Sequence, residues 1–167
     1  IDTGKGWNVL IDAILELRLS GDFAGKRVLF VGYGEQAEML NEKINDLDLS
    51  DCCYYLGPKT HRELSELYNQ ADIMIFPTML YESLGLVGIE AMACGCPVIG
   101  SDIGCLPEYI KEGITGFLFE PGNSHELAER IVDFYKLTEK QRNTMRLEAI
   151  RYVDKYESRK ISQALIN

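Results

Sequence analysis

Two glutamates eight positions apart are the residues best suited to bind a polar ligand. Glu82 precedes an apolar stretch, and Glu90 is the only side chain with a formal charge between Leu84 and Ile99. An unpaired carboxylate inside an apolar helix that is packed on both sides costs on the order of several kcal/mol. We therefore expect Glu90 either to pair with an internal Lys or Arg or to face a ligand cavity, and both alternatives stay open here.

The residues that follow Glu82 predict a helix end suited to an anion. Backbone amides of Ser83 to Leu86 would point outward at a helix N-terminus, where the dipole is positive, which favours a diphosphate. Gly85 and Gly88 would remove side chains that block the approach of the ligand. Glu90 lies roughly 8 Å further along the axis at 1.5 Å per residue. It can accept the vicinal hydroxyls of a ribose there, and Glu82 can accept hydroxyls of a sugar.

Short apolar runs alternate with longer amphipathic segments, which is typical of a parallel sheet covered by helices. We expect a Rossmann-like, doubly wound α/β fold in a single domain over residues 1–167. Ligands of such sheets bind at the carboxyl ends of the strands, so the loops Gly32–Glu35, Gly57–His61, Pro77–Gly85 and Ser101–Leu106 should line one crevice. The predicted strands are Arg27–Gly32, Cys53–Gly57, Asp72–Pro77, Pro97–Ser101 and Gly116–Glu120.

Helical periodicity fills the intervals between these strands. Thr60 and Glu63 form the pattern of a capping box at the start of one helix, and Gly95 followed by Pro97 ends another. The apolar faces or ranges of the predicted helices are Val9–Leu17, Ala37–Leu47, Leu64–Tyr68, Leu84–Cys94, Ser124–Leu137, Glu139–Tyr152 and Glu157–Ile166.

Composition excludes several classes of protein. A formal charge of −9 and a pI near 4.7 argue against a nucleic-acid surface, which needs clustered Lys and Arg. No run of about 18 apolar residues predicts a membrane-spanning helix. Two histidines and five cysteines without a CxxC pair argue against a zinc site, and they favour reduced, buried thiols in a cytosolic protein.

The turn after the first predicted strand matches a dinucleotide-binding pattern. Gly32, Gly34 and Ala37 satisfy GxGxxA between a strand and a helix. That pattern also needs an acid at the end of the second strand, which here reads Tyr55-Leu56-Gly57. The missing acid argues against an NAD-binding oxidoreductase and favours Gly32 and Gly34 as a close turn beside a diphosphate or sugar.

At this point the sequence closely resembles the family-4 retaining glycosyltransferases (glycosyltransferases group 1), which have the two-domain GT-B fold. Matching segments run in order through nearly the whole chain. They are VLFVGYG, ADIMIFP, the Glu82 to Glu90 motif ESLGLVGIEAMACGCPVI, SDIGCLPE and GITGFLFEPG.

The resemblance implies a role for each matched position. Glu82 would contact the donor sugar, and Glu90 would hold the ribose. Lys5, in DTGKG, would neutralise the diphosphate as it leaves, and the backbone of Lys59 would meet the base. The arginine that pairs with this lysine in the family would stand one residue before Ile1. The diphosphate-binding amides would be those of Ser83, Leu84, Gly85, Leu86 and Val87.

We therefore expect the C-terminal, donor-binding half of a GT-B enzyme. The full-length enzyme would transfer a glycosyl unit from a nucleotide sugar, UDP-linked, with retention and without a protein-bound metal or other cofactor. The glycan, lipid or other acceptor would bind mainly to an N-terminal domain, so the chain by itself is expected to be inactive. A cytoplasmic location is expected, with contact to a membrane surface left open. The alternatives are a nucleotide-sugar epimerase of GT-B architecture and the oxidoreductase considered above.

Overall fold

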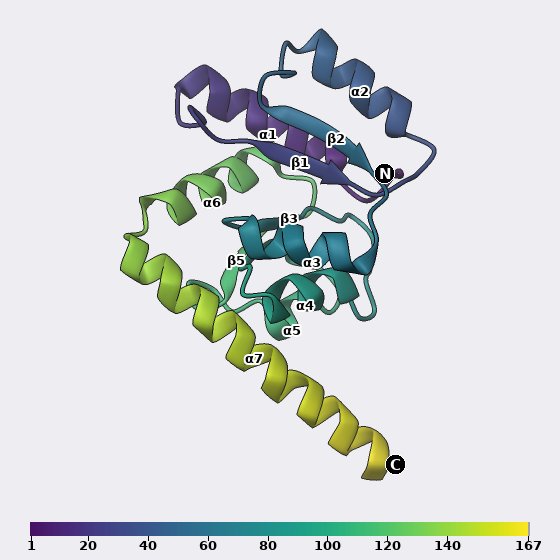
Figure 1. The fold of residues 1–167 in the computed structure, drawn as a ribbon, viewed down its shortest axis with the longest axis vertical. Coiled ribbons are helices and arrows are strands. Elements are labelled where there is room, and N and C mark those ends of the chain that lie inside the picture. Colours follow the sequence, from purple (N-terminus) through teal and green to yellow (C-terminus); the bar gives the residue numbers. More distant parts are fainter. Residues whose placement is uncertain (167) are drawn as a thin grey trace.

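The computed structural model describes the backbone of residues 1–166 and the side chains of residues 1–154. Helices and strands alternate along most of the described chain (Figure 1). Their order is α1 (Trp7–Ser20), β1 (Val28–Val31), α2 (Ala37–Asp46), β2 (Cys53–Gly57), α3 (His61–Gln70), β3 (Met74–Phe76), α4 (Leu86–Ala93), β4 (Val98–Ser101), α5 (Leu106–Tyr109), β5 (Gly116–Phe119), α6 (Ser124–Lys136) and α7 (Glu139–Ile166). All five predicted strands are confirmed, β2 with the predicted bounds and the other four with slightly shorter ones.

The strands pair only in parallel, as predicted, but the hydrogen bonds divide them into two sheets. One sheet holds β1 and β2, and the other has the order β3-β4-β5. In the second sheet Ile99 of β4 stands opposite Ile75 of β3 and Phe117 of β5. Within the described residues no strand pairing joins β1 to β3, so the continuous sheet of a doubly wound fold is interrupted at this place.

Helices cover both faces of the sheets, which confirms the doubly wound arrangement. Neighbouring residues of β4 point to opposite faces: Ile99 enters a core cluster that also contains residues of α1, α2 and α6. Val98 enters a second cluster with residues of α4, α5 and α7. Strands from both sheets contribute to the first cluster, through Phe30 of β1 and Phe117 of β5, so one core supports both.

The predicted helix signals are largely confirmed. The apolar face expected for α1 is buried along its length. At the start of α3 the Thr60 hydroxyl accepts the Glu63 N–H at 3.3 Å, while the Glu63 carboxylate accepts the Thr60 N–H at 2.8 Å. Helix α4 ends before Gly95, whose φ of +72° lies in the left-handed region.

The C-terminal region differs from the prediction of two separate helices. One helix, α7, runs from Glu139 to Ile166 and projects beyond the body of the molecule (Figure 1). Neither Gly nor Pro occurs in this range, so nothing in the sequence ends the helix between the two predicted segments. Ala149 and Val153 pack its described part into the second core cluster. No helix in the described part of the chain has the length and apolarity to cross a bilayer.

Candidate functional site

Two side chains contact the carboxylate of Glu82 beyond the end of β3. The Lys5 ammonium donates a hydrogen bond to Glu82 Oε1 at 2.7 Å, and the Thr78 hydroxyl lies 3.2 Å from the same oxygen. Thr78 is fully buried, the Glu82 side chain is 19% exposed and the Lys5 side chain is 47% exposed. No sequence pattern predicts the pairing of Lys5 with Glu82 or the contact of Thr78 with Glu82. The available signal for Thr78 was a polar residue directly after a buried strand.

The turn that carries Lys5 is held against the segment that carries Thr78. Gly4 O accepts the N–H of Met79 at 2.7 Å. A Cβ atom at Gly6 would lie 1.6 Å from the carbonyl oxygen of Pro77, and the φ of Gly6 is +70°. Only glycine fits these two requirements, since a side chain would collide with backbone and would also disfavour this φ. The glycine on each side of Lys5 thus fixes the ammonium over Glu82.

The amino end of α4 has free hydrogen-bond donors next to this pair. Gly85 caps the helix with a φ of +59° and supplies no side-chain acceptor. In the part of the chain that the structure describes, no acceptor pairs with the five successive backbone N–H groups at this end. Such groups, together with the positive end of the helix dipole, suit an anion. The five belong to Ser83, Leu84, Gly85, Leu86 and Val87.

The backbone N–H groups at the amino end of α2, in contrast, already have acceptors. The Glu35 N–H donates to the Asp2 carboxylate at 3.0 Å, and the Gln36 N–H donates to the carbonyl of Ile1 at 3.1 Å. A Cβ atom at Gly34 would lie 2.3 Å from the oxygen of Ile1. The GxGxxA turn is therefore closed by residues 1–2, which leaves its amides little capacity for a pyrophosphate. Gly34 lies against Ile1 and Asp2, and the contact of Gly32 and Gly34 with a ligand stays a prediction.

Glu90 is half-buried on α4, and its carboxylate has no hydrogen bond or ion pair with any described side chain. Its charge acts on Tyr68 of α3, where burial first and Glu90 second raise the pKa of the phenol to about 12. The internal Lys or Arg partner is thus not observed within the described residues. The expectation that α4 is packed on both sides was wrong, because Leu86 and Val87 are 57% and 40% exposed.

The glycines at the start of α4 pack against a buried aromatic side chain, a contact that no sequence pattern predicts. Cβ atoms at Gly85 and Gly88 would lie 2.7 Å and 2.5 Å from the hydroxyl oxygen of Tyr109, which is fully buried beneath them. The Tyr109 hydroxyl also donates to the carbonyl of Gly85 at 3.2 Å. The Tyr109 side chain occupies the space that a side chain at either position would need, and the φ of Gly85 adds to this requirement for glycine. The expected clearance for a ligand stays a prediction.

The loop after β4 supports Glu82 from the other side. The Cys105 N–H donates to the carbonyl of Glu82 at 2.9 Å. A Cβ atom at Gly104 would lie 2.4 Å from the same oxygen. Lys59 lies apart from this cluster in the turn between β2 and α3, where its charge acts on Glu63.

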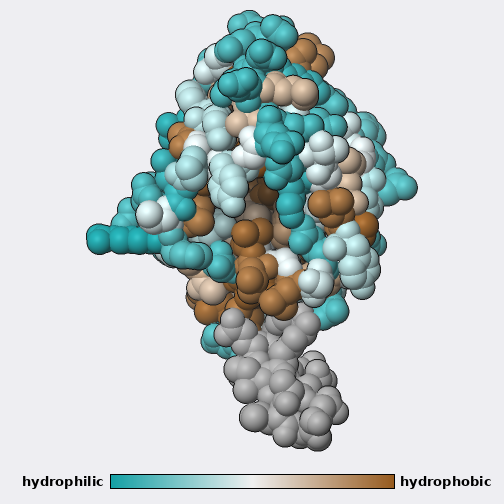
Figure 2. Space-filling model, turned by 90° about the vertical axis from the view of Figure 1, so that its right-hand side faces the viewer, coloured by the Kyte–Doolittle hydropathy of each residue, from teal (hydrophilic) through white to brown (hydrophobic). Residues whose placement is uncertain are grey.

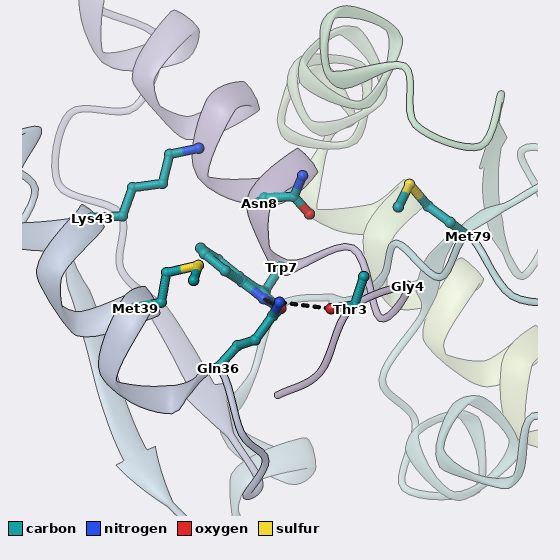
Figure 3. Close-up of a pocket in the computed structure, with 8 residues that line it drawn as sticks. All are labelled: Thr3, Gly4, Trp7, Asn8, Gln36, Met39, Lys43 and Met79. Atoms are coloured by element: carbon teal, nitrogen blue, oxygen red, sulfur yellow. Dashed lines mark hydrogen bonds between the residues drawn. The ribbon is translucent and has the colours of Figure 1, made fainter.

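A pocket of about 310 Å³ lies on the α1 and α2 side of the Lys5 turn (Figure 3). Trp7 and Met79 line part of the pocket, and Gln36 forms hydrogen bonds with two other lining residues. The Gln36 amide donates to the Thr3 hydroxyl at 2.6 Å, and the Trp7 indole N–H donates to the Gln36 amide oxygen at 2.8 Å. The remaining lining residues are Gly4, Asn8, Met39 and Lys43.

Apolar side chains are exposed around the carboxyl ends of the strands. The arrowheads of β1 and β2 in Figure 1 point toward the face that Figure 2 shows, where apolar side chains gather beside a hollow. A soluble domain rarely exposes a large apolar surface unless something binds there. The exposed apolar residues in the loop before α4 and in its first turn are Met79, Leu80, Tyr81, Leu84, Leu86 and Val87.

Known proteins resemble this chain in sequence and in fold. Residues 1–151 match the model of the family described as Glycosyl transferases group 1. The chain is 35% identical over 117 residues to the N-acetyl-alpha-D-glucosaminyl L-malate synthase of Bacillus anthracis, which covers 70% of this chain and 30% of that protein. The crystal structure of Anabaena Alr3699/HepE in complex with UDP-glucose superposes with a TM-score of 0.83 at 26% identity, over 99% of this chain and 46% of that one.

A glycosyltransferase from Rickettsia africae gives a TM-score of 0.83 at 27% identity, over 92% of this chain and 40% of that one. The chain spans less than a third of the length of the curated relatives that it matches and less than half of these two solved structures.

Proposed function

This chain belongs to the glycosyl transferases group 1 family, and from that premise we propose that it binds the nucleoside-diphosphate sugar for a glycosyl transfer. The finer assignment to the family-4 retaining enzymes is part of the proposal. The observation that carries it is the row of unpaired amides at the start of α4, which lies directly after Glu82. Glu82 holds the Lys5 ammonium, and Glu90 stands without a partner among the described side chains two turns further along.

Each part of the donor has a matching group in this arrangement. The diphosphate accepts hydrogen bonds from the amides of Ser83 to Val87, and Glu90 accepts the two vicinal hydroxyls of the ribose. Glu82 receives hydroxyls of the sugar, while Lys59 contributes its backbone to the base. Gly32 and Gly34, in the turn that is bonded to residues 1–2, border the site.

Lys5 supplies positive charge where negative charge develops during the reaction. As the bond between the sugar and the diphosphate breaks, charge accumulates on the departing phosphate oxygens. A cation held in advance stabilises that charge without reorganisation in the transition state. Lys5 is already oriented by Glu82 and by the glycine turn, so its ammonium can be shared between the carboxylate and the phosphate.

The proposed donor is UDP-linked, since the HepE protein of similar fold was crystallised with UDP-glucose. We further propose transfer with retention, without a protein-bound metal, and to an acceptor that binds mainly to another domain of the full-length enzyme. The chain alone then binds nucleotide without transferring sugar. The oxidoreductase alternative gains no support, because the amides of α2 that an NAD pyrophosphate would need are occupied by residues 1–2. The epimerase alternative gains none from the family match, which is to glycosyl transferases.

Calorimetric titration of the chain with UDP, GDP, ADP and NAD tests the proposal. We expect saturable binding of UDP and a roughly ten- to hundredfold loss of affinity in Glu90→Ala, the effect of removing hydrogen bonds to a charged group. Glu148→Ala, on the distant helix α7, is the matched control and should bind UDP as the parent does. Binding of NAD alone, or unchanged affinity in Glu90→Ala, would contradict the proposal.

A further inference from the structure

Tyr81, the residue directly before Glu82, is 80% exposed. Its ring and its hydroxyl make no hydrogen bond or ring contact with any residue in the described part of the chain. Binding surfaces are enriched in tyrosine, because the ring supplies apolar contact area while the hydroxyl stays hydrated. The contacts of Tyr81 within the described chain therefore do not explain why a tyrosine stands here, whereas a ligand would.

The backbone on both sides of Tyr81 is fixed. The Leu80 N–H donates to the Thr78 hydroxyl at 3.2 Å, and the carbonyl of Glu82 accepts the Cys105 N–H at 2.9 Å. Thr78 and Cys105 are both buried. Because a tyrosine side chain has only two χ angles, ordering it on a fixed backbone costs a ligand little conformational entropy. The exposed ring is thus held in advance beside Glu82.

The order of the donor groups along the chain indicates which ligand Tyr81 meets. In the proposed donor site, on which this inference rests, Glu90 holds the ribose, the amides of Ser83 to Val87 hold the diphosphate, and Glu82 holds the sugar. The donor therefore runs against the chain direction, from Glu90 back to Glu82. The next residue in this direction is Tyr81, which lies beyond the sugar, on the side from which an acceptor has to approach.

The groups around Tyr81 indicate the chemistry of that acceptor. A pyranose has a face of C–H bonds, which packs on the negative face of an aromatic ring, and hydroxyls at its edge, which donate to carboxylates. Two carboxylates are available, Glu82 and the exposed Asp102, which belongs to the loop that supports Glu82. An alkyl chain over Tyr81 would leave both without donors. Neither loop, 77–85 or 101–106, contains Lys or Arg, so an anionic acceptor would meet like charges.

We infer that Tyr81 stacks on the acceptor, and that the accepting residue of the acceptor is a neutral pyranose. Tyr81 then determines acceptor specificity from the donor-binding half of the enzyme. It does so by direct contact with the acceptor, while the Lys5–Glu82 pair and the amides of α4 serve the donor.

NMR titration of the full chain, with ¹⁵N-labelled amides and ¹³C-labelled tyrosine rings and with excess UDP present, tests the inference. The probes are the methyl pyranosides of glucose, galactose, mannose and N-acetylglucosamine. We expect saturable shifts of the Tyr81 ring with at least one of these glycosides. Tyr54, whose hydroxyl donates to the Asp51 carbonyl at 2.7 Å at the amino end of β2, is the internal control and should not shift.

Two variants separate the ring of Tyr81 from its hydroxyl. Tyr81→Ala should bind the glycoside roughly three- to tenfold more weakly, as expected from the loss of an aromatic contact. Tyr81→Phe keeps the ring and should bind as the parent does. Because the residue is exposed, both changes leave the core intact. The amides of Leu80 and Glu82 report the affinity in all three proteins.

Two further probes test the chemistry of the acceptor. The corresponding uronic acid glycoside has the same ring with a carboxylate, and it should bind roughly fivefold or more weakly, because like charges about 4 Å apart repel by about 1 kcal/mol in water. Cyclohexanol keeps an apolar ring without the set of hydroxyls and should not shift Tyr81.

An unshifted Tyr81 ring with all four glycosides, or equal affinities of Tyr81→Ala and the parent, would overturn the inference. So would binding of the uronic acid or of cyclohexanol as tight as that of the glycoside. The shifts of Ser83 to Val87 with UDP alone report the donor site separately. Their absence would overturn the proposed function and this inference with it, whereas their presence without any Tyr81 shift would overturn this inference alone.

Discussion

The ammonium nitrogen of Lys5 lies 2.7 Å from Oε1 of Glu82, although 77 positions separate the two residues in the chain. Backbone contacts bring them together. The carbonyl of Gly4 accepts the N–H of Met79, and Gly6 lies so close to Pro77 that only glycine fits. These residues belong to the loop before α1 and the loop after β3, which meet at one sheet edge. A cation so placed is oriented before any ligand arrives. Several consequences of this arrangement can be measured directly.

Replacing Lys5 with methionine should weaken UDP binding while the fold is retained. The side chain is 47% exposed, so its loss costs little packing, whereas a charged hydrogen bond to phosphate contributes about 1.5–3 kcal/mol. We expect a roughly ten- to hundredfold higher Kd for UDP by calorimetry. Lys140→Met, an exposed change on α7, is the control. Equal affinities of Lys5→Met and the control would remove Lys5 from the site.

Thr78 should be important for stability out of proportion to its size. Its buried hydroxyl accepts the N–H of Leu80 at 3.2 Å and lies 3.3 Å from Gly4 O and 3.2 Å from the Glu82 carboxylate. Thr78→Val keeps the shape but leaves these groups without a partner, which costs about 1–3 kcal/mol. Urea unfolding should show this loss, and Thr78→Ser should recover most of it. A valine variant as stable as the parent would contradict the assignment.

Gly6 and Gly25 allow the cost of a collision to be separated from the cost of a backbone angle. Their φ values are nearly equal, +70° and +73°, but a Cβ meets Pro77 O at 1.6 Å at Gly6 and nothing within 4 Å at Gly25. Gly25→Ala should lose on the order of 1 kcal/mol of stability from the left-handed φ alone. Gly6→Ala should lose clearly more and should also weaken UDP binding. Equal losses in both variants would show that the Lys5 turn is not held in this way.

Stability should depend on pH through a contact between α1 and α6. His125 Nδ1 lies 2.6 Å from Glu16 Oε1, and this hydrogen bond, the charge of Glu16 and then that of Glu129 raise the pKa of His125 above 6.5. The contact therefore stabilises the folded chain fully below about pH 6.5 and loses this effect as the pH rises through the raised pKa. Melting temperatures recorded between pH 5.5 and 8.5 should fall with pH, and His125→Gln should fall less steeply. Parallel curves would disprove the link.

Local signals predicted the strands and most helices, because each depends on residues close together in the chain. The capping box of Thr60 and Glu63 is one example. Contacts between distant residues were not predictable in this way: Tyr109 fixes Gly85 and Gly88, and nothing near those glycines indicates a buried aromatic ring about twenty positions later.

The Glu82 to Glu90 spacing indicated two residues of the candidate site, and the family resemblance added Lys5, but neither indicated what positions these side chains. Thr78 follows a strand without any motif of its own, and its contact with Glu82 depends on the path of the loop. The exposure of Leu86 could not be predicted from the sequence either, because an apolar sequence does not distinguish a helix face in the core from a face left open at a binding site.

The most direct test of the donor site is a ¹⁵N-labelled NMR titration of the chain with UDP, which compares the amino ends of two helices. We predict saturable shifts of the amides of Ser83 to Val87, whose N–H groups are free in the described structure, and little change at Glu35 to Ala37, whose N–H groups are already bonded. Shifts centred on Glu35 to Ala37, or none at Ser83 to Val87 with excess UDP, would contradict the assignment of α4 as the diphosphate site.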